Sequence, residues 1–432
     1  MSRRLDRDDG TASRANTDRM HGLAPRSGTA GRTTDAASAR RRGGAGLPAA
    51  RLRRALRLGA PAGALVAALA LAGCTPASEP PAATGGTTDA TEEGPQPTAS
   101  AAPGGSFVPS GEPEVLAEGL DVPWSVVVLD DGATLISERE TARVLELVDG
   151  ALREVGTVPG VRAEGEGGLM GLAALEAGGE RWLYAMHTGA DDNRIVRMPL
   201  QGEPGAVALG APEELLTGIP SSSTHNGGRL AFGPDGKLYA TTGDAQDRPS
   251  SQDAGSLGGK VLRLEPDGSV PSDNPTAGSP VYTLGHRNPQ GLTWDASGQL
   301  WASEFGQDTW DELNRLEPGG NYGWPEVEGQ AGAEGFVDPV VQWSPAEASP
   351  SGLAAAGDSL YLAALRGERL WRIESGEPVT TEAYHAGEFG RLRDAVLAPD
   401  GASLLVLTNN TSRDSAGPGD DRLLRIPLAP AD

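Results

Sequence analysis

The chain has 432 residues and a formal net charge of −23, from 36 basic and 59 acidic side chains. Residues 1–73 hold 14 arginines and 5 acids, which leaves 22 basic and 54 acidic residues, a charge of about −32, in the remainder. So acidic a chain lacks the basic surface that attracts nucleic acid, and no nucleic-acid partner is expected.

The N-terminal part has the pattern of an export signal. A basic segment, Arg51–Arg57, precedes an apolar segment, Leu58–Leu71, which is too short to span a bilayer comfortably. The sequence Leu71-Ala72-Gly73-Cys74 matches the bacterial lipobox, and Cys74 is the only cysteine of the chain. We therefore expect residues 1–73 to be a leader and lipoprotein signal peptide. The protein is expected to be extracytoplasmic, on the outer face of the cell membrane, with the lipid on Cys74 as its only membrane contact. The alternative is an ordinary secretory signal followed by an unused cysteine.

A linker and one large domain are expected after the signal. Residues Thr75–Gly105 are rich in Pro, Ala, Thr, Ser and Gly and have scarcely any large apolar side chain, which is typical of a flexible tether. We assign residues 74–111 to the lipidated linker. Residues 112–432 contain no similar break and are predicted to fold as a single domain.

One short unit recurs through this domain: a turn, most often Asp-Gly, followed by a strand of small apolar residues. The copies begin at Asp130, Gly178, Pro234, Ala296, Gly357 and Pro399. They lie about 42–62 residues apart, which fits one hairpin per blade of a β-propeller. The predicted fold is all-β, a six-bladed β-propeller with Asp235-Gly236 and Asp400-Gly401 in turns between strands. The alternative is two packed sheets with coincidental Asp-Gly hairpins.

His225 has the surroundings expected of a functional histidine. It is followed by Asn226-Gly227-Gly228, where the glycines let other groups approach closely. Asp244 ends the strand-like sequence LYATTGD and is expected to return beside the imidazole. A carboxylate that fixes the tautomer of a histidine is the usual companion of a histidine general base.

Polar and glycine residues are densest in Gly285–Pro325, which reads GHRNPQGLTWDASGQLWASEFGQDTWDELNRLEPGGNYGWP. An Arg-Asn pair, an Asp-Glu pair and an aromatic turn among short β-like runs are typical of loops that build a site. Further on, Gly390-Arg391-Leu392-Arg393-Asp394 has two arginines at alternate positions, and alternate side chains of an extended segment face the same way.

Together with THNGGRLAFGPDGKLY around His225, these sequences resemble the soluble quinoprotein sugar dehydrogenases. Members of that family are six-bladed β-propellers that carry pyrroloquinoline quinone (PQQ) and calcium. The resemblance continues, more weakly, over about Glu112–Pro427. It implies oxidation of the anomeric hydroxyl of an aldose to a lactone, with hydride transfer to C5 of the quinone and then electron transfer to an unidentified acceptor.

The resemblance also implies catalytic roles. His225 matches the base that takes the hydroxyl proton, and Asp244 matches the acid that supports it. Arg287, with Ca²⁺, would stabilise the developing oxyanion. The residue before the histidine is Thr224, where the glucose enzymes often have Asp, so the sugar preference stays open.

The family's contacts to PQQ match four positions of this chain: Arg287, Asn288, Arg391 and Arg393. Guanidinium groups suit this cofactor because they bind carboxylates with two parallel hydrogen bonds. Arg366 lies where the glucose enzymes have a cofactor-binding Lys. Glu166, in the loop Gly165–Gly171, replaces a cofactor-contacting Gln, so it is expected to be protonated or turned away from an anionic ligand.

Calcium prefers about six to eight oxygen ligands. The family's calcium positions correspond to Gly306 and Gln307, through their carbonyls, to Glu312, and to the carbonyl of Tyr322. Phe305-Gly306-Gln307 stands where the glucose enzymes have Gln-Gly-Pro.

Two other functions stay open at this point. A propeller that binds an extracellular ligand without turnover would accommodate the departures at Glu166, Thr224 and Phe305. A calcium-dependent lactonase would need a cluster of carboxylates and Asn around a metal, which the sequence does not reveal.

Overall fold

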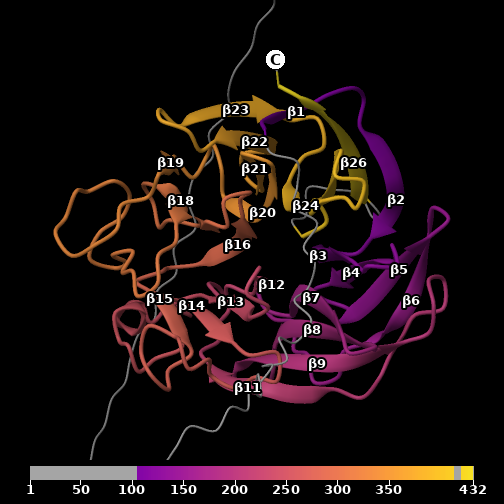
Figure 1. Ribbon diagram of the computed structural model, residues 1–432, viewed down its shortest axis with the longest axis horizontal. Coiled ribbons are helices and arrows are strands. Elements are labelled where there is room, and N and C mark those ends of the chain that lie inside the picture. The colour runs from indigo at the N-terminus through magenta and orange to yellow at the C-terminus, as the bar shows by residue number, and fades with distance from the viewer. Residues whose placement is uncertain (1–104, 413–419, 432) are drawn as a thin grey trace, which may run out of the picture. The chain divides into compact units, whose positions relative to one another are not determined.

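The computed structural model describes residues 105–412 and 420–431, which form six antiparallel β-sheets arranged as the blades of a ring (Figure 1). The predicted six-bladed β-propeller is therefore confirmed. The described residues contain no α-helix, and their one helical segment is the 3₁₀ turn η1 (Arg248–Ser251). None of them forms a helix of the length and apolar character needed to cross a membrane. The predicted signal peptide and the lipid site at Cys74 lie outside the described residues.

Five of the sheets follow one another along the chain. The first contains β3 (Pro123–Val128), β4 (Thr134–Glu138), β5 (Arg143–Val148) and β6 (Ala151–Thr157). The second contains β7 (Leu169–Ala177), β8 (Glu180–Thr188) and β9 (Asn193–Gln201), with β10 (Ala208–Leu209) and β11 (Glu213–Ile219) both paired to β9. The third contains β12 (Leu230–Phe232), β13 (Leu238–Thr242), β14 (Lys260–Leu264) and β15 (Val281–Leu284). The fourth contains β16 (Pro289–Trp294), β17 (Leu300–Glu304), β18 (Asp311–Arg315) and β19 (Val341–Trp343). The fifth contains β20 (Pro350–Ala356), β21 (Ser359–Ala364), β22 (Arg369–Glu374) and β23 (Thr380–Tyr384).

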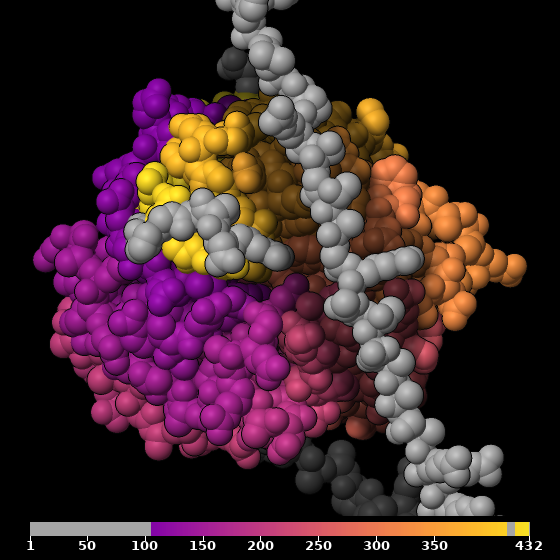
Figure 2. All heavy atoms as spheres, turned by 180° about the vertical axis from the view of Figure 1, so that it is seen from behind, coloured from indigo at the N-terminus to yellow at the C-terminus, as the bar shows by residue number. Residues whose placement is uncertain are grey.

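The sixth sheet closes the ring with strands from both ends of the described chain. It contains β24 (Leu392–Leu397), β25 (Ser403–Thr408) and β26 (Asp421–Pro430), and β26 pairs antiparallel with both β1 (Phe107–Pro109) and β2 (Glu114–Leu120). In Figure 2 the indigo N-terminal part lies beside the yellow C-terminal part. Strand β1 extends the sheet into the C-terminal end of the segment predicted as linker.

Each recurring turn joins the two innermost strands of a blade. The turn before β4 has a hydrogen bond from Gly132 N to Leu129 O of 2.8 Å, and Gly236 before β13 and Gly401 before β25 make the equivalent bonds at 2.9 Å. These three glycines have φ of 90°, 72° and 63°, a region that side chains disfavour. The local chemistry of Asp-Gly therefore explains why the repeat was visible in the sequence.

The hydrophobic core is divided into six clusters, one between each pair of neighbouring blades. One of them packs Tyr239 and Val261 of the third blade against Leu292 and Leu300 of the fourth. Since each sheet is covered on both faces, its central strands are apolar on both sides, and all five residues of β13 are buried. This packing fixes the angles between the blades and so the positions of the loops at the ends of the strands.

Candidate functional site

The predicted site residues lie on loops at one face of the ring. Because the strands of each blade are antiparallel, the start of the innermost strand and the loop after the second strand lie at the same face, opposite the repeated Asp-Gly turns. Glu166, His225, Arg287 and Arg391 precede the innermost strands β7, β12, β16 and β24. Asp244 follows β13, and Gly306 and Gln307 lie between β17 and β18. We call this the site face.

His225 and Asp244 form the predicted pair. Nδ1 of His225 lies 2.7 Å from Oδ1 of Asp244, and the carboxylate is fully buried while the imidazole is 17% exposed. Burial by itself would raise the pKa of Asp244, but hydrogen bonds from His225, from the Gln246 backbone and from Trp324 hold that pKa below its ordinary value. An ionised Asp244 accepts the Nδ1 proton of His225, which leaves Nε2 free to accept a proton from a bound hydroxyl.

Trp324 is a member of the site that sequence reasoning did not single out. Its Nε1 donates to Oδ2 of Asp244 at 2.8 Å, and the guanidinium of Arg287 lies 5.5 Å from the centre of its ring. The only sequence signal was its place in the aromatic turn Asn321–Pro325. That turn lies 80 residues from Asp244 along the chain, so local pattern could not pair them.

Glu166 contacts the backbone of His225 and is turned toward that residue. The His225 N–H donates to Oε2 of Glu166 at 3.0 Å, and the Glu166 N–H donates to the carbonyl of Ser223 at 2.8 Å. A Cβ at the neighbouring Gly165 would lie 2.1 Å from the same carbonyl, so this loop reaches the histidine segment only because glycine stands there.

Arg287 and Asn288 are held firmly at the start of β16. Arg287 donates from Nη1 to the Phe305 carbonyl at 3.2 Å and from Nη2 to the side-chain oxygen of Gln307 at 3.0 Å. Burial lowers the pKa of Arg287, although the nearby carboxylates of Asp244 and Glu304 oppose that shift. Asn288 accepts the N–H of Gly227 at 3.0 Å, so it supports the His225 loop.

The innermost strands carry a ring of polar side chains near their starts, which we call the polar collar. It consists of Ser125, Arg229, Gln290, Ser351, Arg393 and Asp394. The pairing register shifts at the start of β3, β16, β20 and β24, and such bulges turn side chains toward the axis of the ring. Of these residues only Arg393 was singled out from the sequence; the others were missed because bulges leave no mark in hydrophobic periodicity.

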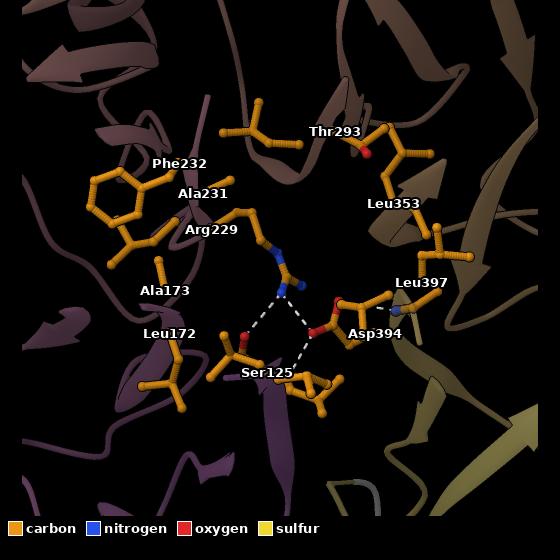
Figure 3. Close-up of a pocket in the computed structure, with 18 of the residues that line it drawn as sticks. Ser125, Leu172, Ala173, Arg229, Ala231, Phe232, Thr293, Leu353, Asp394 and Leu397 are labelled. Carbon is orange, nitrogen blue, oxygen red and sulfur yellow. Dashed lines mark hydrogen bonds and ion pairs between the residues drawn. The ribbon is translucent and has the colours of Figure 1, made fainter. Parts of the chain in front are cut away.

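Two buried arginines dominate the collar. Arg229 forms an ion pair of 2.8 Å with Asp394 and donates to Ser125 (Figure 3). Arg393 donates to Gln290 at 2.7 Å and to Ser351 at 3.2 Å but pairs with no carboxylate of residues 105–412 and 420–431. Burial, followed by repulsion from Arg139, Arg391 and Arg229, lowers the pKa of Arg393 to about 9. Nη2 of Arg229 and Nε of Arg393 are buried and have no hydrogen-bond partner in the part of the chain that the structure describes.

A cavity of the described residues on the ring axis is distinct from the predicted site. It has a volume of about 400 Å³ and follows the ring axis between the six innermost strands, with Ser125, Arg229 and Asp394 at the collar end. None of the predicted site residues lines it. The collar therefore separates this axial channel from the site face.

A second, small cavity of about 10 Å³ gathers several predicted calcium positions. Gly306, Glu312 and Tyr322 line it together with Glu304 and Glu328, which sequence reasoning missed. Burial and the neighbouring Glu304 raise the pKa of Glu312 to about 8. Gln307 does not line the cavity, and its side chain contacts Arg287 instead. Within residues 105–412 and 420–431 no group of three His, Cys, Asp or Glu side chains is placed to hold a metal, so a cation here would depend on backbone oxygens as well.

Among the predicted site residues, Arg366 has the fewest contacts with the rest of the site. It is exposed in the turn between β21 and β22, and its guanidinium forms no ion pair with another described residue. Thr224 contributes to the rim of the site, where the side-chain amide of Gln246 donates to its hydroxyl at 2.7 Å.

The description of the glucose/sorbosone dehydrogenase family matches residues 120–416. Quinoprotein glucose dehydrogenase B of Acinetobacter calcoaceticus is 33% identical over 310 residues, which cover 64% of this chain and 62% of that protein, so this chain spans less than two thirds of its length. Aldose sugar dehydrogenase YliI of Escherichia coli (strain K12) is 31% identical over 347 residues, which cover 69% of this chain and 90% of that protein.

A solved structure gives a stronger match. The PQQ-bound form of aldose sugar dehydrogenase from Streptomyces coelicolor superposes with a TM-score of 0.70 at 48% sequence identity, covering 74% of this chain and 100% of that one. The family match extends over most of the propeller, from β2 to beyond β25. The chain therefore belongs to the glucose/sorbosone dehydrogenase family.

Proposed function

We propose that this protein oxidises aldose sugars at the anomeric hydroxyl, with PQQ and Ca²⁺ as cofactors. The observation that carries the proposal is the pairing of His225 with the buried carboxylate of Asp244, 2.7 Å apart, beside the guanidinium of Arg287. A base, its orienting acid and a fixed positive charge on one face are the groups that hydride abstraction from an alcohol requires.

The arginines of the site fit an anionic quinone. Among the described residues Arg393 has no carboxylate partner and its buried Nε has no acceptor, and its pKa is lowered by burial and by other arginines. A ligand with several carboxylates would supply acceptors and relieve that repulsion. We assign Arg287, Asn288, Arg391 and Arg393 to this role, with Arg366 reaching in from its exposed turn.

The small cavity fits a calcium ion. Glu304 and Glu312 face each other across the pairing of β17 and β18, and two buried carboxylates repel each other without a cation between them. We assign Gly306 and Tyr322, through backbone oxygens, and Glu312 to the metal, and we add Glu304 as a candidate. The carbonyl of Gln307 remains part of the proposed set.

The residues of the chain then have distinct tasks. PQQ, when bound, supplies the quinone that takes up the hydride. Nε2 of His225 accepts the proton of the anomeric hydroxyl as the hydride leaves carbon, so the aldose becomes a lactone. Asp244 holds the imidazole and stabilises its protonated form, and Arg287 supplies a fixed charge to the developing negative oxygen.

Reconstitution tests the proposal. The full chain, freed of metal by a chelator, is mixed with PQQ and Ca²⁺, and dye reduction is followed with a panel of aldoses. We expect turnover that requires both cofactors, with the dye in place of the unidentified natural acceptor. Absence of turnover with every aldose, together with tight binding of a sugar, would favour a binding propeller.

The location of the protein is a separate proposal. We propose that a lipid on Cys74 holds the propeller on the outer face of the membrane, supported by the Leu-Ala-Gly-Cys sequence and the lack of any other cysteine. Cys74→Ser should release the protein from the membrane fraction and abolish lipid labelling. A wild-type protein found free in the medium and without lipid would contradict this anchor.

A further inference from the structure

Lys260 is a buried cation that the proposed chemistry does not use. The chain has 34 arginines and only two lysines, Lys237 and Lys260. Lys260 opens β14 and is fully buried, and its Nζ donates to the carbonyls of Ser250 at 2.7 Å, Ser251 at 3.1 Å and Gly258 at 2.5 Å. We call these three carbonyls the carbonyl cage.

The cage matches an ammonium group. An ammonium has three donors around one compact charge, whereas a guanidinium is planar and larger, which explains why a chain rich in arginine has lysine at this position. The cage contains no carboxylate, and Asp253 is the nearby acid that favours the charge. Burial lowers the pKa of Lys260 to about 8, so the amine still carries its proton at neutral pH.

The carbonyl cage belongs to the segment that connects Asp244 to β14. This segment contacts two other parts of the site, the residues just before Arg287 and the turn that contains Trp324. Ser251 accepts the Gly285 N–H through its carbonyl at 2.9 Å, and its hydroxyl donates to the His286 carbonyl at 2.6 Å, directly before Arg287. Gln252 donates to the Trp324 carbonyl at 2.7 Å. The Ser251 carbonyl thus accepts hydrogen bonds both from the Lys260 ammonium and from the segment just before Arg287.

The segment 245–259 packs so closely against the backbone before Arg287 that a movement of the carbonyl cage would displace both. A Cβ at Gly259 would lie 2.0 Å from the Ser251 hydroxyl and 2.4 Å from the His286 carbonyl. Without the ammonium, three carbonyls would converge in a buried space and each would lose one hydrogen bond, although Ser250 and Ser251 would still accept the backbone N–H groups of Asp253 and Gly285. Such a loss is costly and would be relieved by movement of the segment.

We propose that the Lys260 ammonium acts as a built-in cation that fixes the segment 245–259 and thereby positions Arg287 and Trp324 for the reaction. Lys260 is a positioning residue in this account and does not contact substrate. The effect on turnover rests on the proposed function, but the effect on the loops does not.

The test compares Lys260→Met in the full chain with the wild type and with Lys237→Met. Lys237 is the matched control because it lies in the same blade and forms only a surface ion pair with Glu265, 2.6 Å long. Amide hydrogen exchange is measured without cofactor over residues 245–259, 285–288 and 321–325. We expect Lys260→Met to speed exchange in all three segments by about tenfold or more, while Lys237→Met leaves them unchanged.

Activity and chemical rescue complete the test. With PQQ and Ca²⁺, Lys260→Met should lower kcat by about 10²-fold, because small displacements of positioning groups have effects of this size. In Lys260→Ala, ammonium or methylammonium chloride should restore slow exchange, and sodium chloride should not. If Lys260→Met does not fold, recovery of folded Lys260→Ala with ammonium but not with sodium decides the question in favour of the proposal.

The outcomes separate this proposal from the proposed function. Exchange in Lys260→Met equal to that of the wild type, or Lys260→Ala that responds identically to ammonium and sodium, overturns the built-in cation. A wild-type chain without quinone-dependent turnover overturns the sugar dehydrogenase proposal but leaves the exchange and rescue results valid.

Discussion

At the scale of single residues, the site stores backbone strain around its proposed base. His225, Ala245 and Gln246 have φ of 61°, 48° and 66°, and each non-glycine residue in this region costs on the order of 1 kcal/mol. The two loops hold each other there, since Ala245 donates its N–H to the His225 carbonyl at 3.1 Å. Strain of this kind persists only where surrounding contacts impose it, which is why Glu166 and Asp244 matter together.

The first prediction concerns the base itself. His225→Ala should lower kcat by about 10²–10⁴, the usual contribution of a positioned base, while PQQ binding is retained. The matched control is His385→Ala, because His385 also has a positive φ, 52°, and also lies 2.7 Å from a carboxylate, but in a surface pair with Glu388. Full activity of His225→Ala in steady-state assays would remove the catalytic assignment.

Arg287→Ala should behave differently from His225→Ala. The same guanidinium is proposed to hold the cofactor and to face the developing charge, so both PQQ retention and turnover should fall. Equal and modest losses from the two substitutions would argue against separate roles.

The second prediction concerns Glu166, whose carboxylate holds the His225 N–H. Glu166→Gln keeps an acceptor at this position and should retain most activity. Glu166→Ala leaves the strained backbone of His225 unsupported and should lower kcat by about tenfold or more, with a smaller effect on PQQ affinity. Glu164→Ala, in the same loop and exposed, is the control. A change in PQQ affinity alone would show that Glu166 serves the cofactor rather than His225.

The third prediction is a pH dependence. The pKa of Asp244 in the folded protein is lower than in the unfolded chain, because its hydrogen bonds outweigh the effect of burial. Its ionised form therefore stabilises the folded state above the unfolded pKa, and this contribution is lost as the pH falls through the folded pKa. In urea unfolding, the difference in stability between wild type and Asp244→Asn should shrink below about pH 4. A difference that grows on acidification would contradict the ionised carboxylate.

At the scale of elements, turns and strands, which depend on neighbouring residues, could be predicted from the sequence. Side-chain contacts between different blades could not. Asp-Gly turns and short apolar strands are local, so all six hairpins could be predicted. The pairing of His225 with Asp244 was also accessible, because one hairpin separates them. Trp324 and the ion pair of Arg229 with Asp394 in the collar join segments that are distant in the chain, and only the ring brings them together.

The same reasoning explains why only some of the predicted metal positions line one cavity. Gly306 and Glu312 belong to one hairpin of the fourth blade, so their spacing fits a single cavity. Glu328 enters from the long connection between β18 and β19, where it accepts the Gln307 N–H at 2.8 Å. No periodicity in such a connection indicates where its side chains return.

The fourth prediction tests the close approach of two innermost strands at the collar. A Cβ at Gly352 in β20 would lie 2.1 Å from Oδ1 of Asp394 and 2.6 Å from its Cα, so Gly352→Ala should push Asp394 away from Arg229. We expect a loss of unfolding free energy of about 1–3 kcal/mol or more, measured by urea unfolding. Gly376→Ala is the control because a Cβ there meets no atom within 4 Å. Equal stability of the two variants would mean that the collar tolerates displacement.

At the scale of the whole propeller, the contacts that hold the ring together also determine which of its buried arginines is paired with a carboxylate. The ring is closed by the pairing of β26 with β1 and β2, and the collar ties four blades across the axis through Ser125, Arg229, Gln290 and Asp394. Arg229 is neutralised by Asp394 within this closure. Arg393 forms no ion pair with another described residue and lies among other arginines, so its positive charge is less compensated than that of Arg229.

The fifth prediction follows from this difference between the two arginines. Arg229→Met breaks a buried ion pair and should lower the stability of the cofactor-free protein by about 3–5 kcal/mol, because Asp394 is left unpaired. Arg393→Met removes a repelled charge and keeps much of the packing against Trp124, so its cofactor-free stability should change far less. With PQQ and Ca²⁺ at about 100 times the dissociation constant, the wild type should gain about 2.7 kcal/mol, seen as a higher Tm. Arg393→Met should lose most of this gain at the same concentrations, because an anionic ligand then lacks its central partner. If Arg393→Met kept the full gain but was itself as unstable as Arg229→Met, the charge of Arg393 would be structural, and the proposed cofactor site would have to lie elsewhere on the site face.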